Sequence, residues 1–135
     1  MHRFLSDMKE RIGKMDRDKA YVLWFDELRR EDVEIVGGKS SSLGEMTSET
    51  DVPVPYGFAT TAYAYRQFME RTGLDKEIRE ELKKLTDVED SALLREVTDN
   101  IRAMIVAEEM PADIVEAIKD AYAELGNKMN VDDPF

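Results

Sequence analysis

Two glycines, a lysine and two serines follow one another in the first third of the chain, and these residue types can together contact a phosphate group. They are Gly37, Gly38, Lys39, Ser40 and Ser41. A glycine pair lets the backbone approach a ligand closely, and a lysine ammonium is a point charge suited to phosphate. The serines are expected to begin a short helix near Ser41, whose first N–H groups lack helical partners and attract anions. The alternative is a solvent-exposed turn in which Lys39 contacts only water.

The same stretch departs from the nearest standard phosphate-binding motif. Gly38, Lys39 and Ser40 match the end of a P-loop, but the position five residues before Gly38, where that motif has glycine, holds Val33. A valine lacks the open backbone that wraps a phosphate. The sequence therefore excludes a Walker A nucleoside triphosphatase.

Composition limits the functions that the chain can have. With 135 residues it forms one domain at most, and its formal net charge of −11 disfavours binding to nucleic acid or to an anionic membrane. It has no cysteine, so disulfides and thiolate metal sites are excluded, and no other metal-ligand set stands out. No apolar run of about 18 residues and no signal-peptide pattern is present. These features predict a cytoplasmic location.

Three motifs in a fixed order carry a resemblance to a known family. They are Val22-Leu23-Trp24-Phe25, then Val36-Gly37-Gly38-Lys39 through Leu43-Gly44-Glu45-Met46, then Val54-Pro55 and Gly57-Phe58-Ala59-Thr60-Thr61-Ala62. Their order and spacing resemble the N-terminus of the phosphoenolpyruvate synthase (pyruvate, water dikinase) family over residues 21–135. Ser40-Ser41 and Tyr56 are mild departures. The resemblance implies the N-terminal portion of an ATP-grasp-like nucleotide-binding domain, truncated here, preceded by an amphipathic leader at 1–20.

The resemblance also implies a reaction and its participants. The family converts ATP, pyruvate and water to phosphoenolpyruvate, AMP and phosphate, through a phosphohistidine domain and a pyruvate-binding barrel. Lys39 would contact the ATP phosphates, with Gly37, Gly38, Ser40 and Ser41 around them, and Mg²⁺ would be held by residues outside this chain. His2, the only histidine, lies in the leader and is not expected to be the carrier. The chain is therefore expected to be a fragment without catalytic residues, inactive alone.

Two other interpretations stay open. A related dikinase or a rifampicin phosphotransferase has a similar glycine–lysine segment, so the acceptor need not be pyruvate. The chain could also be a noncatalytic helical interaction module.

Periodicity and turn residues predict an α+β chain with short strands in its first half and helices in its second. The predicted elements are a leader helix ending near Gly13 or Met15, strands at 21–25 and 58–61, and helices at 62–72, 74–85, 91–109 and from Pro111 to Gly126-Asn127. Thr61 and Gly73 are predicted caps of the helix at 62–72. Trp24, Tyr65 and Tyr122 are predicted core residues. The basic pairs Arg29-Arg30 and Lys83-Lys84 are expected on solvated faces.

Overall fold

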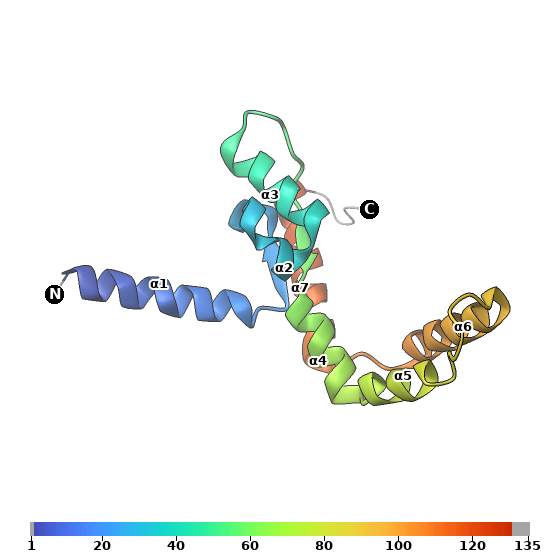
Figure 1. The fold of residues 1–135 in the computed structure, drawn as a ribbon. Coiled ribbons are helices and arrows are strands. Elements are labelled where there is room, and N and C mark those ends of the chain that lie inside the picture. The colour runs from blue at the N-terminus through green and yellow to red at the C-terminus, as the bar shows by residue number, and fades with distance from the viewer. Residues whose placement is uncertain (1, 131–135) are drawn as a thin grey trace. The chain divides into compact units, whose positions relative to one another are not determined.

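Helices and one small sheet make up the chain, in agreement with the predicted α+β class (Figure 1). The structure is a computed structural model that describes residues 2–130. The elements in order are α1 His2–Asp18, β1 Val22–Trp24, the 3-10 helices η1 Phe25–Glu27 and η2 Arg30–Asp32, α2 Val33–Val36, α3 Gly38–Glu49, β2 Phe58–Thr60, α4 Ala62–Thr72, α5 Leu74–Leu82, α6 Ser91–Ala107 and α7 Ala112–Met129. They form two compact units, Met1–Tyr65 with Asp113–Phe135, and Arg66–Ala112.

The sheet of the first unit pairs β1 with β2 in antiparallel fashion. Leu23 lies opposite Ala59, and these two side chains form a buried cluster with Leu28. Because side chains alternate along a strand, Trp24 and Phe58 point to the other face. Both predicted strands are confirmed, although each is shorter than expected.

Helix α3 is held against η1 and η2 by its middle and C-terminal part. A Cβ atom on Gly44 would lie only 2.3 Å from Leu28 Cβ and 2.8 Å from the Leu28 carbonyl oxygen, so only glycine permits this approach. Arg29 Nη1 donates to Ser48 Oγ at 2.7 Å. The N–H of Arg30 donates to Glu45 Oε2 at 3.0 Å. Arg29 is therefore structural, whereas a solvated pair was expected.

Helix α1 continues to Asp18, so the prediction that it ends near Gly13 or Met15 is wrong. A Cβ at Gly13 would meet nothing within 4 Å, and one glycine inside a helix costs only about 1 kcal/mol. Tertiary contacts hold the last turn: Arg17 Nη2 donates to Asp32 Oδ2 at 2.7 Å and to the Glu27 carbonyl oxygen at 3.0 Å. Asp32 is buried and also accepts the N–H of Arg29.

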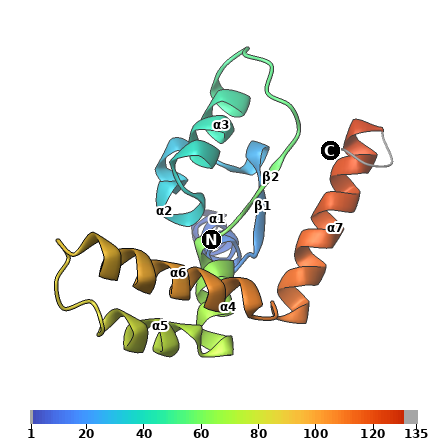
Figure 2. The ribbon, with the colours of Figure 1, turned by 90° about the vertical axis from the view of Figure 1, so that its right-hand side faces the viewer.

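Helix α7 is joined to the β1 region at both ends. The Tyr21 hydroxyl donates to Asp113 Oδ2 at 2.8 Å near the start of α7, and Lys128 Nζ lies 3.9 Å from the centre of the Trp24 ring near its end. Figure 2 shows α3 and α7 on opposite sides of the two strands. The predicted end at Gly126-Asn127 is wrong, because Gly126 is buried within a helix that runs to Met129.

Helix α4 has the predicted limits and caps. Thr61 Oγ1 accepts the N–H of Ala64 at 3.1 Å, and Gly73 has a φ of +79° directly after the helix. Tyr65, however, is 59% exposed, so its prediction as a core residue is wrong. Tyr122 on α7 is likewise at the surface. Both tyrosines follow the three- and four-residue spacing of core positions. The buried face of α4 and of α7 is nevertheless too narrow to include them.

The second unit contains the hairpin of α5 and α6. Asp90 caps α6 by accepting the N–H groups of Ala92 and Leu93. Between the helices, the buried Glu81 carboxylate accepts hydrogen bonds from Lys84 Nζ at 2.6 Å and Asn100 Nδ2 at 2.8 Å. The hydrogen bond from Lys84, and then that from Asn100, hold the pKa of Glu81 below its usual value. Lys84 therefore joins this contact, while Lys83 pairs with Glu80 at the surface.

Candidate functional site

The glycine–lysine turn lies at the N-terminus of α3. Gly37 has φ 82° and ψ 166°, a backbone conformation essentially restricted to glycine. Its N–H donates to the Val33 carbonyl oxygen at 2.8 Å, and its carbonyl oxygen accepts the N–H of Ser41 at 3.1 Å. Helix α3 thus begins at Gly38, earlier than the predicted start near Ser41. Helical geometry leaves the N–H groups of Gly38, Lys39 and Ser40 without intrahelical partners.

The surroundings of this turn are open. A Cβ at Gly37 would meet nothing within 4 Å, and one at Gly38 would meet only Val33 Cγ2 at 4.0 Å. Gly37, Gly38 and Lys39 are exposed, and Ser40 is half-buried. Among residues 2–130, no group forms an ion pair or hydrogen bond with the Lys39 ammonium. An anion could therefore reach this turn without displacing a protein group.

Ser41 differs from the other four predicted site residues. Its side chain is only 2% exposed, and its hydroxyl donates to the Gly38 carbonyl oxygen at 3.1 Å. This bond closes the first turn of α3 from inside. Ser41 can therefore shape the turn, while the exposed surface is made by the residues before it.

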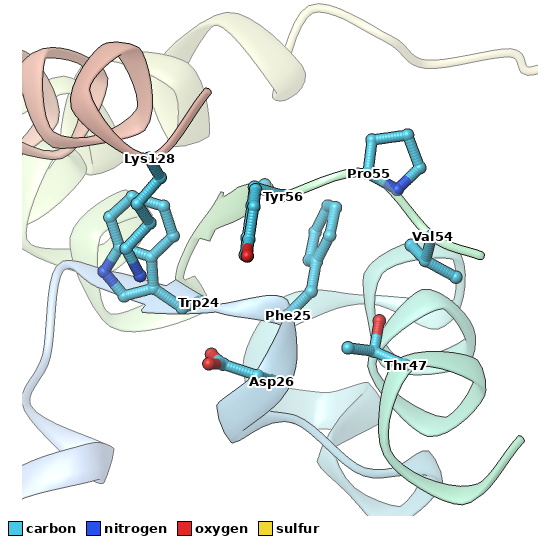
Figure 3. Close-up of a pocket in the computed structure, with 9 residues that line it drawn as sticks. Trp24, Phe25, Asp26, Thr47, Val54, Pro55, Tyr56 and Lys128 are labelled. Carbon is cyan, nitrogen blue, oxygen red and sulfur yellow. The ribbon is translucent and has the colours of Figure 1, made fainter. Parts of the chain in front are cut away.

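A hollow in the first unit lies beside the C-terminal part of α3. Its volume is about 70 Å³, and it is lined by Trp24, Phe25, Asp26, Thr47, Val54, Pro55, Tyr56, Gly57 and Lys128 (Figure 3). The Lys128 ammonium lies over the Trp24 ring in a cation–π contact. Trp24 is half-buried and meets Phe58 edge-to-face, with 5.5 Å between the ring centres. The hollow does not include the glycine–lysine turn.

The sequence predicted neither this hollow nor the place of Lys128 in it. Lys128 is distant from Trp24 in the chain, and a lysine near a helix end has an ordinary explanation in the helix dipole. Within the part of the chain that the structure describes, no group of three or more His, Cys, Asp or Glu side chains could hold a metal ion. No helix among the described residues is long and apolar enough to cross a membrane.

Comparison with known proteins identifies the class of this chain. Residues 33–135 match the family described as pyruvate phosphate dikinase, AMP/ATP-binding domain. The match covers most of the chain and all of the glycine–lysine turn, so the chain belongs to this family of nucleotide-binding domains.

Among individual relatives, phosphoenolpyruvate synthases are similar to this chain. The phosphoenolpyruvate synthase of Neisseria meningitidis is 49% identical over 115 residues, covering 83% of this chain and 14% of the relative. That of Synechocystis is 40% identical over 132 residues, covering 93% and 16%. The resemblance in the three sequence motifs is thereby confirmed. The chain spans only 14% and 16% of the length of these two relatives.

Proposed function

We propose that this chain is the N-terminal portion of the nucleotide-binding domain of a phosphoenolpyruvate synthase. The whole protein would convert ATP, pyruvate and water to phosphoenolpyruvate, AMP and phosphate, in the cytoplasm. Residues 1–20 would be a leader and residues 21–135 the start of an ATP-grasp-like domain. The observation that carries the proposal is the AMP/ATP-binding family match over residues 33–135, which includes an open, glycine-bounded helix N-terminus.

Within this proposal Lys39 contacts the ATP phosphates. Its ammonium is exposed at the first turn of α3, next to backbone N–H groups that lack helical partners. A positive charge and the positive end of a helix dipole then act on the same anion. Gly37 and Gly38 keep the approach free of side-chain atoms, while Ser40 and Ser41 support the turn. Mg²⁺ would neutralise negative charge on the phosphates. It would be held by ligands elsewhere in the protein, since no group of the described residues could hold a metal ion.

The test is the ATP half-reaction of the full-length protein, in which the carrier histidine is phosphorylated. Lys39→Ala removes a charge-assisted contact worth roughly 1.5–3 kcal/mol, so this step should slow about tenfold or more. Lys119→Ala is a matched control, because Lys119 is also an exposed lysine of the first unit. If Lys39→Ala phosphorylates the carrier histidine as fast as Lys119→Ala does, the lysine is a solvated surface residue and this assignment is wrong.

The 135-residue chain should not perform the whole reaction. It holds one histidine, His2, which lies outside the matched residues 33–135, and it spans a small part of its relatives. An exposed lysine contributes only about 1 kcal/mol in high dielectric, so ATP should bind no better than millimolar, about −4 kcal/mol. Calorimetry on this chain and on the full-length protein compares the two. Micromolar binding by residues 1–135, or pyruvate-dependent AMP release, would contradict the proposal.

The acceptor is tested separately from the nucleotide. The three sequence motifs favour pyruvate, and the similar proteins reported above are named phosphoenolpyruvate synthases. A full-length protein that phosphorylates its carrier histidine but passes the group to another acceptor belongs with the related dikinases or rifampicin phosphotransferases. A protein with no ATP-dependent step would instead be a noncatalytic helical interaction module.

A further inference from the structure

Arg17 joins the end of helix α1 to the segment that leads into the glycine–lysine turn. Its Nη2 atom donates to Asp32 Oδ2 at 2.7 Å and to the Glu27 carbonyl oxygen at 3.0 Å. Glu27 is the last residue of η1, and Asp32 is the last residue of η2. Arg17 therefore contacts both 3-10 helices, although it lies outside the residues 33–135 that match the nucleotide-binding family.

The Asp32 carboxylate is turned away from the helix that follows it. Asp32 occupies the N-cap position of α2, where an aspartate usually accepts N–H groups of the first turn, but its side chain makes no such bond. The carboxylate instead accepts Arg17 Nη2 and, at 2.8 Å, the N–H of Arg29. The side chain of Asp32 is only 6% exposed, so its negative charge needs these partners in place of water. Without Arg17, the buried carboxylate would keep only the Arg29 N–H of these two donors.

A single helical turn connects Asp32 to the glycine–lysine turn. Helix α2 spans only Val33–Val36, and the N–H of Gly37 donates to the Val33 carbonyl oxygen at 2.8 Å. Helix α3 follows directly, with Lys39 in its first turn. Because no irregular segment separates Asp32 from Gly37, a displacement of Asp32 would move the backbone that carries Lys39.

The body of α3 is fastened by other contacts. Gly44 packs against Leu28, and Arg29 Nη1 donates to Ser48 Oγ at 2.7 Å. Neither contact includes Arg17. The loss of Arg17 should therefore loosen the glycine–lysine turn while the C-terminal part of α3 stays packed.

We infer that Arg17 is a positioning residue for the phosphate contact of Lys39. It holds Asp32, and through the single turn of α2 it sets the place of the glycine–lysine turn. The inference rests on the proposed function, in which Lys39 contacts the ATP phosphates. The last turn of α1 then belongs to the nucleotide site, whereas residues 1–20 were expected to be only a leader.

The test measures the ATP half-reaction of the full-length protein. Arg17→Met keeps an unbranched apolar stem and removes the charged donor, and it should slow this step about tenfold, because a misplaced contact loses much of its effect on the reaction. Lys19→Met is the matched control, since Lys19 is an exposed cation two residues further along the chain, and it should change the rate by less than about twofold. Equal rates for the two variants would overturn the inference.

A double variant separates positioning from a general loss of folded protein. In a protein that already carries Lys39→Ala, Arg17→Met should slow the step by less than about threefold further, because the side chain that Arg17 positions is gone. A loss of folded protein would instead multiply the two effects, and this result would overturn the inference.

The conservative variant Arg17→Lys tests the ion pair itself. One atom of Arg17, Nη2, makes both hydrogen bonds, so a single ammonium can replace it. The half-reaction of Arg17→Lys should be at least about threefold faster than that of Arg17→Met, because the charge and the donor are kept. Equal rates for these two variants would show that the ion pair does not position the turn, and would overturn the inference.

Hydrogen exchange gives a readout that needs no nucleotide. In the full-length protein, peptides that contain residues 37–41 should exchange about tenfold faster in Arg17→Met than in Lys19→Met, because the turn opens more often. Unchanged exchange would overturn the inference, whatever the ATP step does.

Failure of the inference can be told from failure of the proposed function. If Lys39→Ala slows the half-reaction and Arg17→Met does not, the inference alone is overturned. If Lys39→Ala leaves the rate unchanged, the proposed role of Lys39 is wrong and the inference is overturned with it.

Discussion

The two ends of helix α3 have opposite environments. Its C-terminal part is fastened to η1 and η2 through the close approach of Gly44 to Leu28 and the hydrogen bond between Arg29 and Ser48. At its N-terminal turn, a Cβ added at Gly37 would meet nothing within 4 Å and one at Gly38 would meet only Val33 Cγ2. One helix can thus be held rigidly at one end and leave its other end open to an anion. Gly44 permits tight packing at one end, and Gly37 and Gly38 leave open space at the other.

The largest loss of stability is expected at the fastened end. In the 135-residue chain, Gly44→Ala would force a Cβ to within 2.3 Å of Leu28 Cβ, close to backbone atoms that cannot swing away. Overpacking of this kind costs about 1–3 kcal/mol, and we expect about 3 kcal/mol in urea unfolding. The control is Gly38→Ala, whose nearest neighbour is 4.0 Å away, with a change within about 0.5 kcal/mol. Equal effects would remove the contrast between the two ends.

A smaller loss is expected at Gly37, for a different reason. Gly37→Ala meets no neighbouring atom, but its φ of 82° with ψ of 166° is strained for any residue with a Cβ. The free energy of unfolding should fall by about 1–3 kcal/mol. Gly13→Ala is the control: it also has open space but lies inside α1, so it should stabilise by about 0.5–1 kcal/mol. If both substitutions stabilise the chain, the turn does not depend on glycine at position 37.

The hydrogen bond at the fastened end should contribute less than the packing there. Ser48→Ala removes the acceptor of the 2.7 Å hydrogen bond from Arg29, and the free energy of unfolding should fall by about 1 kcal/mol. Ser42→Ala is matched to it, since Ser42 is an exposed serine on the same helix, and it should change stability by less than about 0.5 kcal/mol. A Ser48→Ala variant as stable as Ser42→Ala would mean that Gly44 packing alone holds α3.

The smallest effect on stability is expected at the open end itself. Lys39 is exposed and has no partner among the described residues, so Lys39→Ala should change the unfolding free energy by less than about 0.5 kcal/mol. The same variant should slow the ATP half-reaction of the full-length protein. Urea unfolding and the carrier phosphorylation rate therefore separate stability from function. A large destabilisation by Lys39→Ala would show that the turn is part of the packed structure.

Local signals predicted the elements well where a cap or a glycine marked an end. Thr61 and Gly73 gave the limits of α4, because each end is decided by its own hydrogen bonds or backbone conformation. At α3 the first serines suggested a start near Ser41, but Gly37 supplies the positive φ and the helix begins at Gly38. At Gly126 the glycine signal failed, because burial decides whether a helix continues past it.

The candidate site was predictable only as a segment. The residues 37–41 are contiguous, so their proximity needed no fold. The burial of the Ser41 side chain depends on the register of α3. The sequence did not predict it, because α3 begins at Gly38, earlier than expected. The contact of Lys128 with Trp24 joins opposite ends of the chain, and the closeness of Gly44 to Leu28 depends on how η1 packs against α3. Such long-range contacts leave no periodic pattern in the sequence.

Trp24 is the only tryptophan in these 135 residues, and it lies half-buried with the Lys128 ammonium 3.9 Å from the centre of its ring. Indole emission responds to nearby charge and to water, and with one tryptophan the indole emission of this chain comes from one known place. A segment or ligand that enters the hollow beside Trp24 would alter the emission, whereas an anion at Lys39 would leave it unchanged. The chain thereby carries its own optical probe, which distinguishes events at the two ends of α3 without any label.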